Sequence, residues 1–103
     1  MSEKNEKILE DKVKLHQQVC EQLNDTYHKK NHDYNDAFAK RFAKRGVIYV
    51  IDKLQEKLDR IEALDAGVPL VEGENMEDSL LDLANYAIMA LVEKNSYIRR
   101  VSV

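Results

Sequence analysis

Three acidic residues recur at intervals of four in the C-terminal half of the chain. They are Glu74, Asp78 and Asp82, and Asn85 follows three residues later. Residues four apart are neighbours on a helix, with Cβ atoms roughly 5–6 Å apart, so the spacing predicts carboxylates along one helical edge. Ionised carboxylates this close repel each other, and a shared proton or a divalent cation relieves the repulsion. Because Mg²⁺ takes oxygen ligands from carboxylates, phosphates and water, we expect a Mg²⁺ site here, with Mn²⁺ as the alternative metal.

Structural roles compete with metal binding for the same residues. Asn75 followed by Asp78 is the pattern of a helix N-cap and its third helical position. Asp82 lies beyond the first helical turn, so capping does not explain it, and a salt bridge to a neighbouring helix is its alternative role. Glu74 taken alone fits a solvated loop.

A second charged set lies in the string EKLDRIE, residues 56–62. It lies off an apolar stripe at helical spacing. The stripe consists of Val47, Val50, Ile51, Leu54, Leu58, Ile61 and Leu64. One interpretation of the charges is a solvated face of salt bridges. In the functional interpretation, Glu56 faces the acids of the later helix across a groove, while Lys57 and Arg60 contact phosphates.

The hydrophobic pattern predicts a single all-α domain over residues 1–103, a bundle of three to four helices. Helices are expected over about 4–30, 36–44, 47–65 and from near 75 through 93. Asn35 or Asp33 is expected to cap the second helix, and Gly46 to end it. The tail, 96–103, is expected to form a short strand or a frayed end.

The last helix, residues 76–93, is apolar almost all the way round. A helix of this kind is usually buried, so we expect it at the centre of the bundle. A chain of 103 residues builds only a modest core. We therefore expect a second subunit to complete the bundle, as a homodimer or a higher homo-oligomer.

The composition and the net charge limit the classes of partner that we expect for this chain. The formal net charge of −3 argues against nucleic acid, and the longest apolar stretch, 83–92, is too short to span a bilayer. Cys20 is the single cysteine, expected at the core edge of the first helix, and it excludes an internal disulfide. The first residues lack the apolar run of a secretory signal, so a cytoplasmic location is expected.

Three strings resemble the phage-associated family called nucleotide modification associated domain 1. They are KNHDYNDAF (30–38), EKLDRIEAL (56–64) and VEGENMEDSLLDLANYAIMAL (71–91). The positions that match the family pattern are Lys30, Asn31, Asp33 and Tyr34, then Glu56, Lys57 and Arg60, then Glu74, Asp78, Asp82 and Tyr86. The chain departs from the pattern at Asn35, where glycine is frequent, and at Phe38, where tryptophan is common.

The family is in turn similar to the all-α nucleotide pyrophosphohydrolases of the MazG and dimeric dUTPase type. That resemblance implies a Mg²⁺-dependent enzyme that splits a nucleoside triphosphate into monophosphate and pyrophosphate. The implied catalytic residues are Glu56, Asp78 and Asp82, with Glu74 as a further metal ligand. The implied substrate contacts are Lys30, Asp33, Tyr34, Lys57, Arg60 and Asn85. The rival hypothesis is a non-catalytic helical interaction protein whose acids form interhelical salt bridges.

Overall fold

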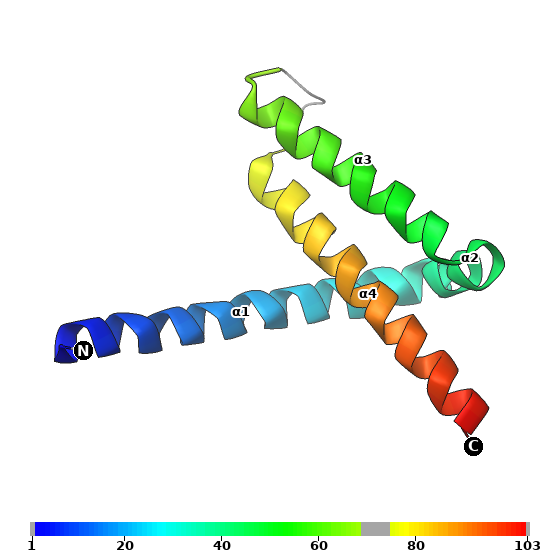
Figure 1. Ribbon diagram of the computed structural model, residues 1–103, viewed down its shortest axis with the longest axis horizontal. Helices are drawn as coiled ribbons and strands as arrows, with labels where there is room; N and C mark the ends of the chain where they lie inside the picture. Colours follow the sequence, from blue (N-terminus) through cyan, green and yellow to red (C-terminus); the bar gives the residue numbers. More distant parts are fainter. Residues whose placement is uncertain (1, 69–74, 103) are drawn as a thin grey trace. The chain divides into compact units, whose positions relative to one another are not determined.

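The computed structural model describes the backbone of residues 2–68 and 75–102, and side chains through Ser96. Within these ranges the chain forms four helices and no strand, which confirms the predicted all-α class (Figure 1). The helices are α1 (Glu3–Asp33), α2 (Ala37–Arg45), α3 (Val47–Asp65) and α4 (Met76–Ser102). Contacts divide the chain into two compact units, Met1–Tyr34 and Asn35–Val103. None of the described helices combines the length and apolar character needed to cross a bilayer.

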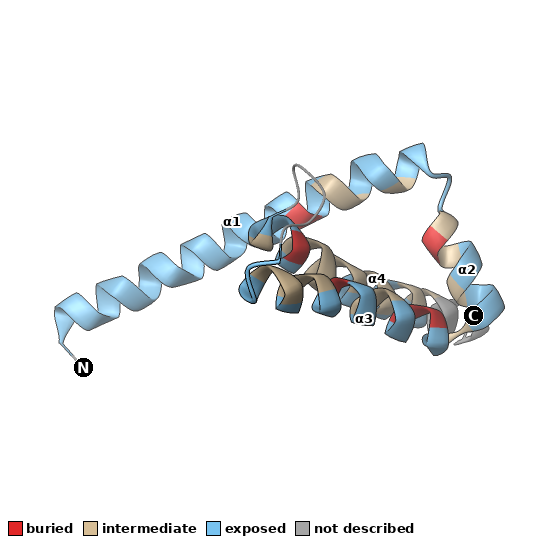
Figure 2. Cartoon of the chain, turned by 90° about the horizontal axis from the view of Figure 1, so that it is seen from above, coloured by how far each residue is buried: buried red, intermediate tan, exposed pale blue. Residues whose placement is uncertain are grey.

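The first unit consists of the 31-residue helix α1. It begins at Ser2, whose hydroxyl accepts a hydrogen bond from the backbone N–H of Asn5 at 3.2 Å. Acidic residues in its first turn and basic residues in its last turn complement the helix dipole. Most of α1 is exposed (Figure 2). Cys20 is exposed as well, so the prediction that it lies at a core edge is wrong.

The second unit begins with an unusual turn into α2. Asn35 and Asp36 both have left-handed backbones, with φ of 51° and 57°. Asp36 holds the N-cap position without a side-chain hydrogen bond, so the prediction that Asn35 or Asp33 caps α2 is wrong. At the other end of α2, Gly46 has φ 71° and ψ −154°, and its N–H donates to the carbonyl oxygen of Phe42 at 2.7 Å. Gly46 therefore ends α2, as predicted, and also directly precedes α3.

Helices α2, α3 and α4 meet around an aromatic cluster. Phe38 of α2 and Tyr49 of α3 are buried, with ring centroids 5.4 Å apart. The ring of Tyr86 on α4 lies 6.0 Å from Phe38. Such aromatic pairs contribute about 0.5–1.5 kcal/mol each beyond the area that they bury. The cluster thus joins all three helices of this unit.

Helix α3 spans Val47–Asp65, which confirms the predicted range, but its buried face differs from the predicted stripe. Val50 is buried, whereas Val47, Ile51 and Leu58 are exposed. The buried residues of α3 are Tyr49, Val50 and Lys57. The inward face is therefore rotated toward Tyr49 and includes a lysine.

Helix α4 runs beside α3, and both ribbons are seen along their length in Figure 1. It continues through Ser102, so the prediction of a short strand or frayed end over 96–103 is wrong. The helix was expected at the centre of the bundle, but the described part of its own unit leaves one of its sides exposed. Leu80, Ile88 and Leu91 are 50%, 43% and 60% exposed.

The start of α4 provides a test of how the acids of this helix are positioned. The side-chain oxygen of Asn75 accepts a hydrogen bond from the backbone N–H of Asp78 at 2.8 Å. Replacing Asn75→Ala removes this cap and is expected to lower the free energy of unfolding by about 1 kcal/mol in urea titrations. Asn75→Asp keeps a cap acceptor and should retain wild-type stability. Equal losses in both variants would show that capping is not what matters at this position.

Candidate functional site

A buried ammonium group lies between α3 and α4. Lys57 of α3 is 8% exposed, and its Nζ lies 3.2 Å from Oδ2 of Asp82 on α4. The carboxylate of Asp82 is half-exposed, with 39% of its side chain accessible. A buried charge is costly unless it is paired, so Asp82 supplies the counter-charge that Lys57 requires. Part of the Asp82 side chain therefore stays open to solvent.

Aromatic rings line the ammonium groups of this region. Nζ of Lys57 lies 5.9 Å from the ring centroid of Tyr86, and Nζ of Lys53 lies 5.8 Å from that of Tyr49. Lys53 also pairs with Glu56 at 3.6 Å. Contacts between a cation and an aromatic face contribute about 0.5–1 kcal/mol when exposed and more when desolvated. Two lysines are thus held at fixed positions on one side of α3.

The phenol of Tyr86 stays neutral in this environment. Burial raises the pKa of Tyr86 above its usual value of 10.0, and the positive charge of Lys53 offsets part of this rise. Asp82 and Glu56 add smaller contributions in the same direction as burial. At neutral pH Tyr86 therefore remains protonated and does not add a negative charge beside Asp82.

The predicted acid set is only partly assembled. Asp78 is exposed in the first turn of α4, one turn before Asp82, while Glu56 and Asp82 each have a lysine partner. Glu74 lies outside the described residues. Among the residues with described side chains, no group of three or more His, Cys, Asp or Glu could hold a metal ion. A cation at Asp78 and Asp82 would thus need oxygen ligands from a bound phosphate or from other residues.

The remaining predicted substrate residues fall in two places. Lys30, Asp33 and Tyr34 belong to the unit Met1–Tyr34, where all three are exposed and Asp33 pairs with His32 at 3.7 Å. The described part of the second unit contains Arg60 and Asn85, each partly buried. Their roles toward a nucleotide stay predictions.

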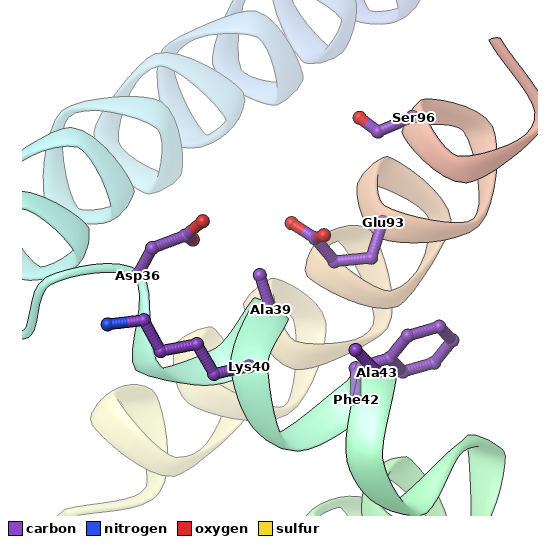
Figure 3. Close-up of a pocket in the computed structure, with 7 residues that line it drawn as sticks. All are labelled: Asp36, Ala39, Lys40, Phe42, Ala43, Glu93 and Ser96. Atoms are coloured by element: carbon purple, nitrogen blue, oxygen red, sulfur yellow. The ribbon is translucent and has the colours of Figure 1, made fainter. Parts of the chain in front are cut away.

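A hollow of about 570 Å³ lies between α2 and the later turns of α4 (Figure 3). It is lined by Asp36, Ala39, Lys40, Phe42, Ala43, Glu93 and Ser96. The carboxylates of Asp36, in the turn before α2, and of Glu93, on α4, both point into it (Figure 3). Its lining includes none of the residues predicted for the nucleotide site.

Two features of the site were missed in the sequence. Lys57 was placed off the core in both interpretations of its helix, and Tyr86 matched the family pattern but was given no role. The spacing contained a signal for Lys57, because Val50, Leu54, Lys57 and Ile61 follow the four-three-four repeat of one helical face. Tyr86, four residues after Asp82, shares its face of α4 in the same way.

Comparison with known proteins agrees with the first resemblance. The profile of the nucleotide modification associated domain 1 family matches residues 30–93, more than half of the chain. That range includes the Lys57–Asp82 pair and the aromatic cluster. No curated protein and no solved structure matches the chain.

The ion pair predicts an asymmetric response to mutation. Asp82→Asn leaves the buried Lys57 without its counter-charge and should lower the free energy of unfolding by about 1–3 kcal/mol, less than for a fully buried pair because Asp82 is partly solvated. Removing both charges, in Lys57→Met with Asp82→Asn, should recover much of the loss. Urea titration of the wild type, both single variants and the double variant measures this coupling.

The matched control is Glu56→Gln, which breaks the more exposed pair with Lys53. It should change stability by no more than about 0.5 kcal/mol. If Asp82→Asn were as mild as this control, the pair would not stabilise the contact between α3 and α4.

Proposed function

Because the chain belongs to the nucleotide modification associated domain 1 family, we propose that it is a nucleotide-binding helical domain whose phosphate contacts lie on α3 and α4. The observation that supports this proposal best is the buried ammonium of Lys57, paired with a half-exposed carboxylate. A cation that is already desolvated and positioned loses little hydration or side-chain entropy when a phosphate oxygen approaches it. Lys57 is accordingly proposed as the central phosphate contact, with Arg60 beside it.

The proposed metal is Mg²⁺, with Mn²⁺ as the alternative. Asp78 and Asp82 would hold it together with phosphate oxygens of the ligand, with Glu56 and Glu74 as the further proposed ligands. The bound cation would neutralise phosphate charge and activate water for attack on phosphorus. Since Lys57 now neutralises Asp82, metal binding at this carboxylate requires the ammonium to move from Asp82 toward the phosphates. Lys57 would thus exchange one anionic partner for another.

The proposed activity is hydrolysis of a nucleoside triphosphate to monophosphate and pyrophosphate, as in the MazG and dimeric dUTPase type. Such an activity would serve phage nucleotide metabolism in the bacterial cytoplasm. The catalytic set proposed is Glu56, Asp78 and Asp82. Lys30 would add a phosphate contact, and Tyr34 would stack on the base. Asp33 is proposed to accept hydrogen bonds from the base or sugar, and Asn85 to accept or donate them.

A second candidate function is supported by the same ion pair. In a non-catalytic interaction protein, Lys57 and Asp82 would stabilise the contact between α3 and α4 and nothing more. The interhelical pair of Asp82 with Lys57 is what that hypothesis expects, whereas the pair of Glu56 with Lys53 lies within α3. The two functions differ in what they require of Lys57, because only the nucleotide site needs its ammonium to meet a phosphate.

The test is a panel of ribo- and deoxyribonucleoside triphosphates, measured with Mg²⁺ and again with EDTA. Thermal melts report binding, since a ligand that binds only the folded state raises the melting temperature, and pyrophosphate release reports catalysis. We expect at least one nucleotide to raise the melting temperature and to be hydrolysed only with Mg²⁺. Lys57→Met should abolish both effects, whereas Lys40→Met, a change on α2, should leave them unchanged.

The outcomes separate the hypotheses. Binding without pyrophosphate release would retain the nucleotide site and exclude the enzyme. No effect of any nucleotide, with or without Mg²⁺, on the melting temperature would favour the interaction protein.

A further inference from the structure

Helix α4 has a second apolar face that the described part of its own unit does not cover. Its residues recur at intervals of four, three and four: Leu80, Ala84, Ala87 and Leu91. This spacing places them on one stripe of the helix. Leu80 and Leu91 are 50% and 60% exposed, and Ala87 is exposed. We call these four residues the outer stripe of α4.

The outer stripe lies away from the core side of the helix. Tyr86 and Met89 pack against the aromatic cluster of Phe38 and Tyr49. Tyr86 and Met89 are offset from Ala84, Ala87 and Leu91 by one or two residues, which is a rotation of about 100–200° around the helix. The stripe therefore faces outward while α4 uses its other side to hold the unit together. The extra apolar face explains why the helix reads as apolar all the way round.

The outer stripe has the same order of residue types, Leu-Ala-Ala-Leu, in both directions of the helix, so two antiparallel copies can pair residue by residue. If two copies of α4 cross antiparallel with their centres between Asn85 and Tyr86, Ala84 lies opposite the partner's Ala87. In the same register Leu80 lies opposite the partner's Leu91. Small residues thus meet at the centre, where they permit close approach of the backbones, and leucines meet on both sides.

The charges at the ends of the stripe fit this register as well. Glu77 and Lys94 are exposed at the two ends of the described apolar face. The antiparallel register places Glu77 opposite the partner's Lys94, and the symmetry repeats the pair on the other side. A parallel arrangement would place like charges together. The charge pattern consequently selects a second copy in antiparallel orientation.

We propose that α4 is the interface of a twofold-symmetric homodimer, with the outer stripe packed antiparallel on the partner's outer stripe. This inference does not rest on the proposed nucleotide function, because neither Lys57 nor Asp82 takes part in it. A helix that is half-exposed in one chain then becomes the centre of a dimeric bundle.

The first test is the mass of the full chain in solution. We expect light scattering in the micromolar range to give twice the 12.0 kDa of one chain. Ala87→Glu places two like charges near the symmetry axis and should raise the dimer dissociation constant at least about 100-fold, with helix content unchanged because Ala87 is exposed and glutamate favours helices. Leu91→Lys is a second variant with the same expected effect. The control, Ala43→Glu on α2, makes the same chemical change off the stripe and should leave the dimer intact.

The second test addresses orientation by reversing charge. Glu77→Lys should raise the dissociation constant about tenfold at low salt, because it replaces two attractive rim pairs with repulsive ones, and less at high salt. Adding Lys94→Glu to the same chain should restore wild-type affinity. A monomeric wild type would overturn the proposal, as would a dimer that survives both Ala87→Glu and Leu91→Lys. Failure of Lys94→Glu to rescue Glu77→Lys would overturn the antiparallel register.

Discussion

The unit formed by α2, α3 and α4 depends on a cation held out of water. Lys57 sits on the buried side of α3, and its ammonium requires an anionic partner at a fixed distance. Within the part of the chain that the structure describes, α4 supplies that partner through Asp82. Apolar side chains tolerate a small shift of one helix along another, but a buried charge does not, because a displaced partner leaves it unpaired. The ion pair therefore sets the register in which the aromatic rings of the three helices meet.

This constraint connects structure and proposed function. A lysine that only stabilised the helix contact would be replaceable by an apolar residue of similar size, often without loss of stability. A lysine that also meets phosphate must keep its charge, and its partner must stay accessible enough to release it. Asp82 is half-exposed, whereas Lys57 is nearly buried, and this asymmetry leaves one side of the pair open to an incoming ligand. The structural role of Lys57 is compatible with its proposed phosphate role, since the same ammonium could serve Asp82 in the free state and a phosphate in the bound state.

The sequence predicted the helices well where short-range signals agree. Glycine at position 46 and the helical period after it gave the range of α3, and Asn75 gave the start of α4. Prediction failed where the outcome depends on long-range packing. The burial of Lys57 was missed because it depends on packing against α4, although a salt bridge from Asp82 to a neighbouring helix was one of the roles considered for that acid. The turn at Asn35 and Asp36 was missed since two successive left-handed residues other than glycine are uncommon.

The candidate site was predictable only in part for a related reason. Repeats of four residues located Asp78 and Asp82 on one helix, because that relation is local. Whether such acids face a metal, a lysine or solvent depends on the opposing helix. The structure gives the lysine to Asp82, and the nucleotide and metal contacts remain proposals.

The corner at Gly46 has a mechanical consequence. One residue ends α2 and precedes α3, so the two helices share a joint with a single pair of backbone dihedrals between them. If α2 tilts, either those dihedrals rotate or α3 moves with it. Its φ of 71° with ψ of −154° lies in a region open essentially to glycine alone, although no atom lies within 4 Å of the place a Cβ would take. A residue other than glycine at position 46 would therefore strain this joint and change the angle at which α2 meets α3.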